Sequence, residues 1–159
     1  HSATKSMLFI SAIGLTDASG YKRDFFEVTG AGYRNKIAGV GFVVGSFSMV
    51  GIPMFAGFVS KLMFAQAAIE DASWRMFPAI IVLSISTILN AVYFLKTVLR
   101  IYTPMPKEQQ EAKGYVNISW KQHKVYAVAI VLFIIVNVFL GCNSKPILML
   151  IEQGLHNFM

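Results

Sequence analysis

The sequence predicts an all-α fold: a polytopic transmembrane helical bundle of about five crossings, with one helix broken near Pro53 and Gly57. Hydrophobic residues make up 55% of the 159 residues and charged residues only 14%, against about 25% charged in an average soluble domain. The mean hydropathy is +0.58. Residues 76–95 and 125–142 carry no charge, and each run is close to the about 20 apolar residues that cross a bilayer.

The first crossing is predicted over residues 1–16, where the chain begins inside an apolar pattern and without an initiator methionine. We therefore interpret the sequence as a fragment of a longer membrane protein, cut or processed within a helix. The polar, turn-rich stretch "TDASGYKRD" ends this crossing. It opens a basic connector over residues 17–36.

Residues 37–69 form a second apolar region, which as one helix would be about 50 Å long. That exceeds the roughly 30 Å of a hydrocarbon core. Pro53 has no N–H group and disfavours helix in the residue before it. The region is therefore predicted to form two short crossings, 36–51 and 53–70, with Gly51, Pro53 and Gly57 at the helix break.

The rest of the chain is predicted to form two longer crossings, over residues 75–102 and 124–142, which a basic loop at 103–123 joins. Together these segments define a transmembrane region over residues 1–142. The tail at 143–159 has apolar residues at helical spacing and is predicted to lie along the membrane interface.

The number of crossings decides where the two basic connectors lie. The positive-inside rule places basic loops on the cytoplasmic side. Five crossings put residues 17–36 and 103–123 on opposite sides of the membrane, whereas four crossings put both inside. The length of residues 37–69 favours five and the charge rule favours four.

Two lysines are predicted to lie inside the bilayer. Lys5 is about 18 Å of helix from Asp17, and Lys61 is about 13 Å from Glu70. His1 precedes Lys5 by one turn on the same helix face. A charge at this depth costs at least about 3 kcal/mol, so such residues usually face a protein interior or a hydrated cavity. The alternatives are a snorkelling Lys5 and a Lys61 paired with the carboxylate of a neighbour.

No bond-making chemistry is visible in the sequence. It has no glycine-rich phosphate loop, no paired catalytic carboxylates and no clustered metal ligands, and its single Cys142 excludes an internal disulfide. We therefore expect no cofactor, and an enzymatic role only as a subunit of a larger enzyme. The net charge is +6. The basic residues lie at the ends of apolar runs, which indicates contact with lipid headgroups rather than with nucleic acid.

What remains is a row of protonatable groups that could relay protons: His1, Lys5, Lys61 and Lys96. Desolvation disfavours the charged form of a lysine, so a buried amine can release and take up a proton near neutral pH. Lys96 is equally well explained as a lysine that snorkels from the end of its crossing.

Two motifs resemble the antiporter-like membrane subunits of respiratory complex I and of Mrp-type cation/proton antiporters. "HSATKSMLF" is similar to that family's His-x-x-x-Lys-x-x-x-Phe helix, and "GIPMFAGFVSK" to its Gly-x-Pro-x-x-x-Gly-Phe-x-Ser-Lys segment. The resemblance implies that His1 and Lys5 belong to a central proton relay on the tenth of fourteen helices. It implies that Lys61 is the terminal proton-exchanging residue, on a discontinuous twelfth helix. The family's earlier glutamate–lysine pair would lie upstream of His1, so the chain resembles the C-terminal half of one subunit.

Three functions follow as hypotheses. The first is a proton-translocating subunit of an NADH-quinone oxidoreductase-like complex in the bacterial inner membrane, with other membrane subunits as partners and the redox chemistry in those partners. The second is an Mrp-type sodium/proton antiporter subunit. The third is a membrane scaffold that transports nothing and whose lysines pair with acidic groups of a partner.

Overall fold

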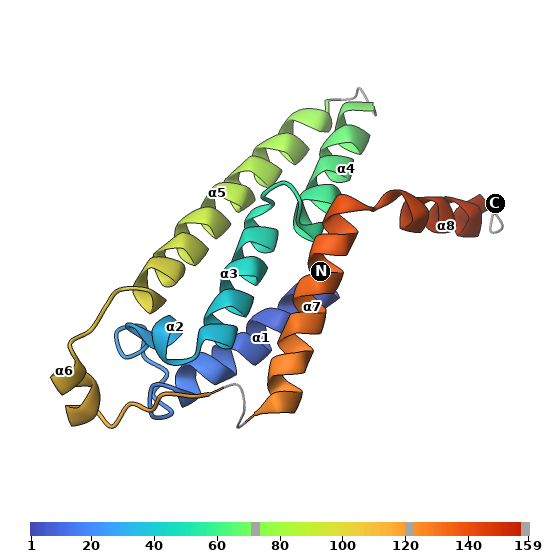
Figure 1. The fold of residues 1–159 in the computed structure, drawn as a ribbon. Coiled ribbons are helices and arrows are strands. Elements are labelled where there is room, and N and C mark those ends of the chain that lie inside the picture. The colour runs from blue at the N-terminus through green and yellow to red at the C-terminus, as the bar shows by residue number, and fades with distance from the viewer. Residues whose placement is uncertain (71–73, 120–122, 157–159) are drawn as a thin grey trace.

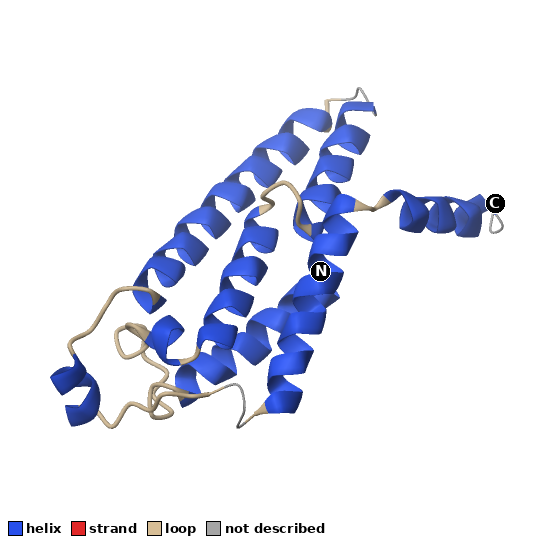
Figure 2. Ribbon diagram, viewed as in Figure 1, coloured by secondary structure: helices blue, strands red, loops and turns tan. Residues whose placement is uncertain are grey.

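The computed structural model describes residues 1–70, 74–119 and 123–156, and every regular element within them is a helix (Figure 2). In chain order the helices are α1 (Ser2–Asp17), α2 (Ala31–Arg34), α3 (Lys36–Val50), α4 (Ala56–Glu70), α5 (Met76–Ile101), α6 (Lys107–Ala112), α7 (Lys124–Cys142) and α8 (Lys145–His156). The predicted all-helical class is confirmed. Both α5 and α7 are long and apolar enough to cross a membrane.

The described parts of the two basic connectors lie together at one end of the bundle, which we call the connector end (Figure 1). Backbone hydrogen bonds join them to each other and to α5. The Val116 N–H donates to the Ala18 carbonyl at 3.3 Å, and the Ile118 N–H donates to the Arg34 carbonyl at 2.9 Å. The Gly30 N–H donates to the Arg100 carbonyl at 3.3 Å.

Helices α3 and α4 follow one another through the bundle, and α5 runs back beside both of them (Figure 1). Each has 15 residues, or about 22 Å of helix, which is less than a bilayer core of about 30 Å. The five predicted crossings are therefore not confirmed. The described parts of both basic connectors lie at the same end of the bundle (Figure 1), as expected if α3 and α4 together form one broken crossing.

Helices α1, α3 and α7 pack together at the centre of the bundle. Met7 and Ile130 are fully buried between them. The buried positions of α1 are Thr4, Met7, Ser11, Gly14 and Leu15. By contrast, the apolar side chains of α5 are largely exposed on this chain, as expected for a helix that faces lipid or another subunit.

The predicted tail at 143–159 forms α8, which extends away from the bundle after α7 (Figure 1). Residues 157–159 of that prediction lie outside the described residues. Exposed Met149, Leu150 and Ile151 give α8 an apolar surface, and its interfacial position stays a prediction.

Candidate functional site

The predicted helix break lies between the end of α3 at Val50 and the start of α4 at Ala56. Gly51 ends α3 in a left-handed conformation with φ +88°. The Gly51 N–H donates to the Phe47 and Ser48 carbonyls at 3.0 and 3.1 Å, and the Ile52 N–H donates to Phe47 at 3.0 Å. This is the usual hydrogen-bond pattern of a glycine-ended helix. A side chain would strain the backbone at this φ. Pro53 follows in the exposed turn before α4 begins.

The Lys61 amine lies at the C-terminal end of α3. Its Nζ donates to the Val50 carbonyl at 2.9 Å and to Thr87 Oγ1 of α5 at 2.9 Å. A Cβ placed on Gly51 would lie 2.8 Å from Lys61 Cδ, so the lysine stem packs directly against the break. The last carbonyls of a helix carry the negative end of its dipole and stabilise a cation. Among the described residues, no acidic side chain forms an ion pair with Lys61.

Three buried polar side chains hold the start of α4, and we call Thr4, Ser48 and Asn137 the polar clamp. Asn137 Oδ1 accepts the Ala56 N–H at 3.2 Å, and Ser48 Oγ accepts the Gly57 N–H at 3.1 Å. Asn137 Nδ2 donates to Thr4 Oγ1 at 2.7 Å, which lies 3.2 Å from Ser48 Oγ. The three residues are 3%, 0% and 0% exposed. Sequence reasoning missed the clamp, although Asn137 stands out as an amide in an apolar run.

His1 directly precedes α1 and lies one turn before Lys5, and both residues are exposed on this chain. The Lys5 amine has no hydrogen bond or ion pair within the part of the chain that the structure describes. The neighbouring Thr4 points the other way, into the polar clamp. The structure thus brings the helix of Lys5, but not its amine, into contact with the break.

Lys96 lies toward the connector end of α5, about 13 Å of helix from Thr87. It is exposed, and its amine is 5.7 Å from the centre of the Phe25 ring. The Arg100 guanidinium lies over the Phe25 and Phe26 rings at 5.3 and 4.5 Å. The structure therefore does not bring Lys96 to the Lys61 amine.

At the connector end, Arg34 is 4% exposed, and its guanidinium joins the two ends of the loop that follows α1. It donates to the Ala18 carbonyl at 3.0 Å, the Thr29 carbonyl at 2.9 Å and Ser19 Oγ at 3.0 Å. Its guanidinium also lies 4.2 Å from the centre of the Tyr115 ring.

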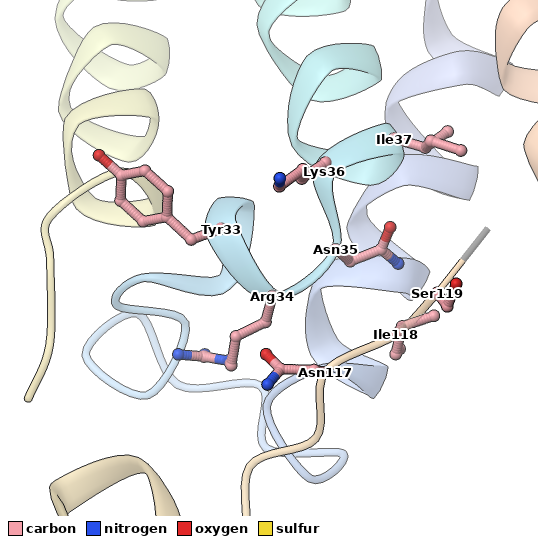
Figure 3. Close-up of a pocket in the computed structure, with 8 residues that line it drawn as sticks. All are labelled: Tyr33, Arg34, Asn35, Lys36, Ile37, Asn117, Ile118 and Ser119. Atoms are coloured by element: carbon pink, nitrogen blue, oxygen red, sulfur yellow. The ribbon is translucent and has the colours of Figure 1, made fainter. Parts of the chain in front are cut away.

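An open pocket of about 540 Å³ lies beside Arg34 (Figure 3). It is lined by Tyr33, Arg34, Asn35, Lys36, Ile37, Asn117, Ile118 and Ser119. The Arg34 guanidinium already has its three partners, and the Asn35 side chain bonds the Gly14 carbonyl and the Ala38 N–H. Since the pocket lies at the opposite end of α3 from the helix break, we assign the candidate site to the break.

Glu27 links the two connectors. It accepts hydrogen bonds from the Tyr115 hydroxyl and from Lys113 Nζ at 3.0 Å, and Lys22 Nζ lies 3.6 Å away. The hydrogen bond from Tyr115 and then that from Lys113 lower the pKa of Glu27 to about 2, from an ordinary value of 4.5.

This lowered pKa predicts an acid-sensitive connector. A carboxylate whose pKa is lower in the folded state stabilises the fold fully above its ordinary pKa, and the stabilisation is lost as the pH falls from about 4.5 to about 2. We expect the thermal midpoint of the wild type to fall further over this range than that of Glu27→Gln, as measured in detergent. The other carboxylates are common to both proteins, so equal falls would contradict the role of Glu27.

Comparison with known proteins places these features in a family. Residues 1–99, which contain both motifs and the helix break, match the family model described as NADH:quinone oxidoreductase/Mrp antiporter, transmembrane. The chain belongs to this family. The predicted resemblance is confirmed, and the membrane location of the bundle agrees with it.

Named relatives come from both branches of the family. The chain is 32% identical over 122 residues to the antiporter subunit mnhD2 of Staphylococcus haemolyticus, covering 69% of this chain and 23% of the relative. It is 30% identical over 114 residues to NADH-quinone oxidoreductase subunit N of Desulforudis audaxviator, covering 70% and 22%. Subunit N of Rhodococcus opacus is 28% identical over 138 residues, covering 87% and 24%. The chain thus spans about a quarter of the length of these relatives.

Proposed function

We propose that this chain is the C-terminal part of a proton-translocating membrane subunit of an NADH-quinone oxidoreductase-like complex, and that Lys61 carries protons through it. The observation that carries the proposal is the position of the Lys61 amine at the C-terminal end of α3. There it donates hydrogen bonds to the Val50 carbonyl and the Thr87 hydroxyl. Broken membrane helices place ion sites at such ends because their backbone groups are unpaired there.

The chemistry of this site suits a proton carrier. Both partners of the amine are neutral acceptors, so they can bind the ammonium form without fixing it as a carboxylate would. Desolvation by the surrounding apolar residues opposes the charge. An amine under these opposing effects can change its protonation state when a neighbouring charge changes.

His1, Lys5 and Lys96 complete the proposed path. His1 and Lys5 are exposed on this chain, and a charge at mid-membrane depth requires cover by protein or water. We propose that the rest of the subunit covers this face of α1 and continues the relay there. Lys96, toward the basic connector end, would exchange protons with water on that side.

The experiment compares Lys61→Ala and Lys5→Ala with the wild type in the full-length subunit within its complex. We expect each variant to assemble and to lower proton translocation into vesicles by more than about tenfold, because an apolar side chain cannot hold a proton at mid-depth. Near-normal translocation by assembled Lys61→Ala would exclude its role. The scaffold hypothesis predicts the opposite pattern, with poor assembly and full activity in whatever assembles.

A sodium/proton antiporter subunit of the Mrp type is the second candidate, favoured by the mnhD2 relative. It differs in the ion exchanged rather than in the proposed lysine path. Proton movement that depends on a sodium gradient, with no dependence on quinone reduction, would select it over the first proposal.

A further inference from the structure

The polar clamp joins three helices that are far apart in the sequence. Thr4 is on α1, Ser48 is on α3 and Asn137 is on α7, and a hydrogen bond links Thr4 to each of the other two. All three side chains are almost completely buried. Buried polar groups in a membrane are costly, and they usually mark positions that hold helices or serve function.

The clamp satisfies the backbone at the start of α4. The first N–H groups of a helix have no partner within the helix, and leaving them unpaired inside a membrane costs several kcal/mol each. The Ala56 and Gly57 N–H groups instead donate to Asn137 and Ser48. The start of α4 is thereby fixed against α3 and α7 at the helix break.

This arrangement also fixes the lysine. Lys61 lies one turn after Gly57 on α4, so a shift of the first turn moves the base of the Lys61 side chain. Ser48 therefore acts at both sides of the break: its side chain holds Gly57, and it lies half a turn before Val50, which receives the Lys61 amine.

The clamp is not a cation site, although hydroxyl and amide oxygens at a broken helix suggest one. Asn137 Oδ1, Ser48 Oγ and Thr4 Oγ1 each accept an N–H group. Two of these N–H groups come from the positive end of the α4 dipole, which disfavours a bound cation. The hydrogen bonds thus favour a clamp that holds the backbone.

We propose that Thr4, Ser48 and Asn137 are positioning residues for proton translocation, which hold the first turn of α4 so that Lys61 meets Val50 and Thr87. The inference rests on the proposed function of Lys61. It adds that transport depends on hydroxyl and amide groups that carry no proton themselves.

Ser48→Ala in the full-length subunit within its complex tests the proposal, with Ser46→Ala as the matched control. Both serines are buried on α3, but within the described part of the chain the Ser46 hydroxyl bonds only to the Phe42 carbonyl of its own helix. We expect Ser48→Ala to lower proton translocation about tenfold, within the hundredfold loss that a displacement of about 1 Å can cause. We expect faster amide exchange at Gly57 in Ser48→Ala, because this N–H loses its acceptor. Ser46→Ala should change neither quantity.

A second set of variants covers the case in which Ser48→Ala does not assemble. Thr4→Val removes the hydroxyl and keeps the shape of the side chain, whereas Thr4→Ser keeps the hydroxyl. Ser11→Ala is the control on the same helix, since the buried Ser11 hydroxyl has no partner among the described residues. Loss of translocation in Thr4→Val, with wild-type rates in Thr4→Ser and Ser11→Ala, supports the clamp.

Two results overturn the proposal in distinguishable ways. If Lys61→Ala stops translocation but Ser48→Ala and Thr4→Val run at the rates of their controls, the clamp has no positioning role and the proposed function stands. If Lys61→Ala itself translocates protons normally in the same preparation, the proposed function fails and the clamp has nothing to position.

Discussion

Replacing Gly57 by alanine is expected to prevent normal packing of the bundle. A Cβ at this position would lie 1.8 Å from the Ser48 carbonyl oxygen and 2.7 Å from its carbon. These are backbone atoms of α3, so no side-chain rotation relieves the clash. Overpacking commonly costs about 1–3 kcal/mol and sometimes more, and we expect about 3 kcal/mol or more here. The measurement is the thermal midpoint of the purified full-length subunit, together with the yield of intact complex.

Gly154→Ala is the control for this prediction. Among the described residues, nothing lies within 4 Å of a Cβ at Gly154 in α8, and alanine favours a helix over glycine by about 1 kcal/mol. We expect wild-type yield and an unchanged or raised midpoint. A Gly57→Ala variant as stable as Gly154→Ala would show that α4 does not approach α3 as described.

Most helices could be predicted from local patterns in the sequence, such as uncharged apolar runs. The uncharged runs at 76–95 and 125–142 lie within α5 and α7, and the predicted crossing at 36–51 corresponds to α3. The break at Gly51 was also predicted, because glycine and proline act on the backbone at their own positions. These signals depend on neighbouring residues alone, so one sequence is enough to read them.

The number of crossings was harder to predict because it depends on how α3 and α4 lie in space. The length of residues 37–69 suggested two crossings, yet the break lets two short helices follow one another through the bundle. The basic composition of both connectors favours the four-crossing alternative instead, because it reflects the side of the membrane on which a loop lies and helix length does not.

The contacts at the site could not be predicted from spacing. Thr4 and Asn137 are far apart in the sequence. Thr4 is one of several polar residues near the start of α1, and Asn137 is an amide in an apolar run. Thr87, which receives the Lys61 amine, is one of several hydroxyl side chains on α5. Their roles follow only from the packing of α1, α3, α5 and α7. The motifs around Lys5 and Lys61 named the proposed proton carriers but not the residues that hold them.

Lys61→Arg is expected to separate the charge of Lys61 from its ability to titrate. An arginine keeps a positive charge and hydrogen-bond donors for the Val50 carbonyl and the Thr87 hydroxyl, but it does not deprotonate in proteins. If Lys61 only stabilised the helix break through its charge, Lys61→Arg would keep the wild-type rate of proton translocation. If Lys61 carries protons, the variant should assemble and lose more than about nine-tenths of its translocation.

The initial rate of proton translocation per assembled complex, in vesicles that carry Lys61→Arg, is the measurement that bears most directly on the proton-carrying role of Lys61. Assembly is checked in the same preparation by the yield of intact complex, with the wild type and Lys61→Ala alongside. We expect Lys61→Arg to assemble like the wild type and to translocate protons no faster than Lys61→Ala. Translocation at the wild-type rate by assembled Lys61→Arg would contradict the role of Lys61 as a proton carrier.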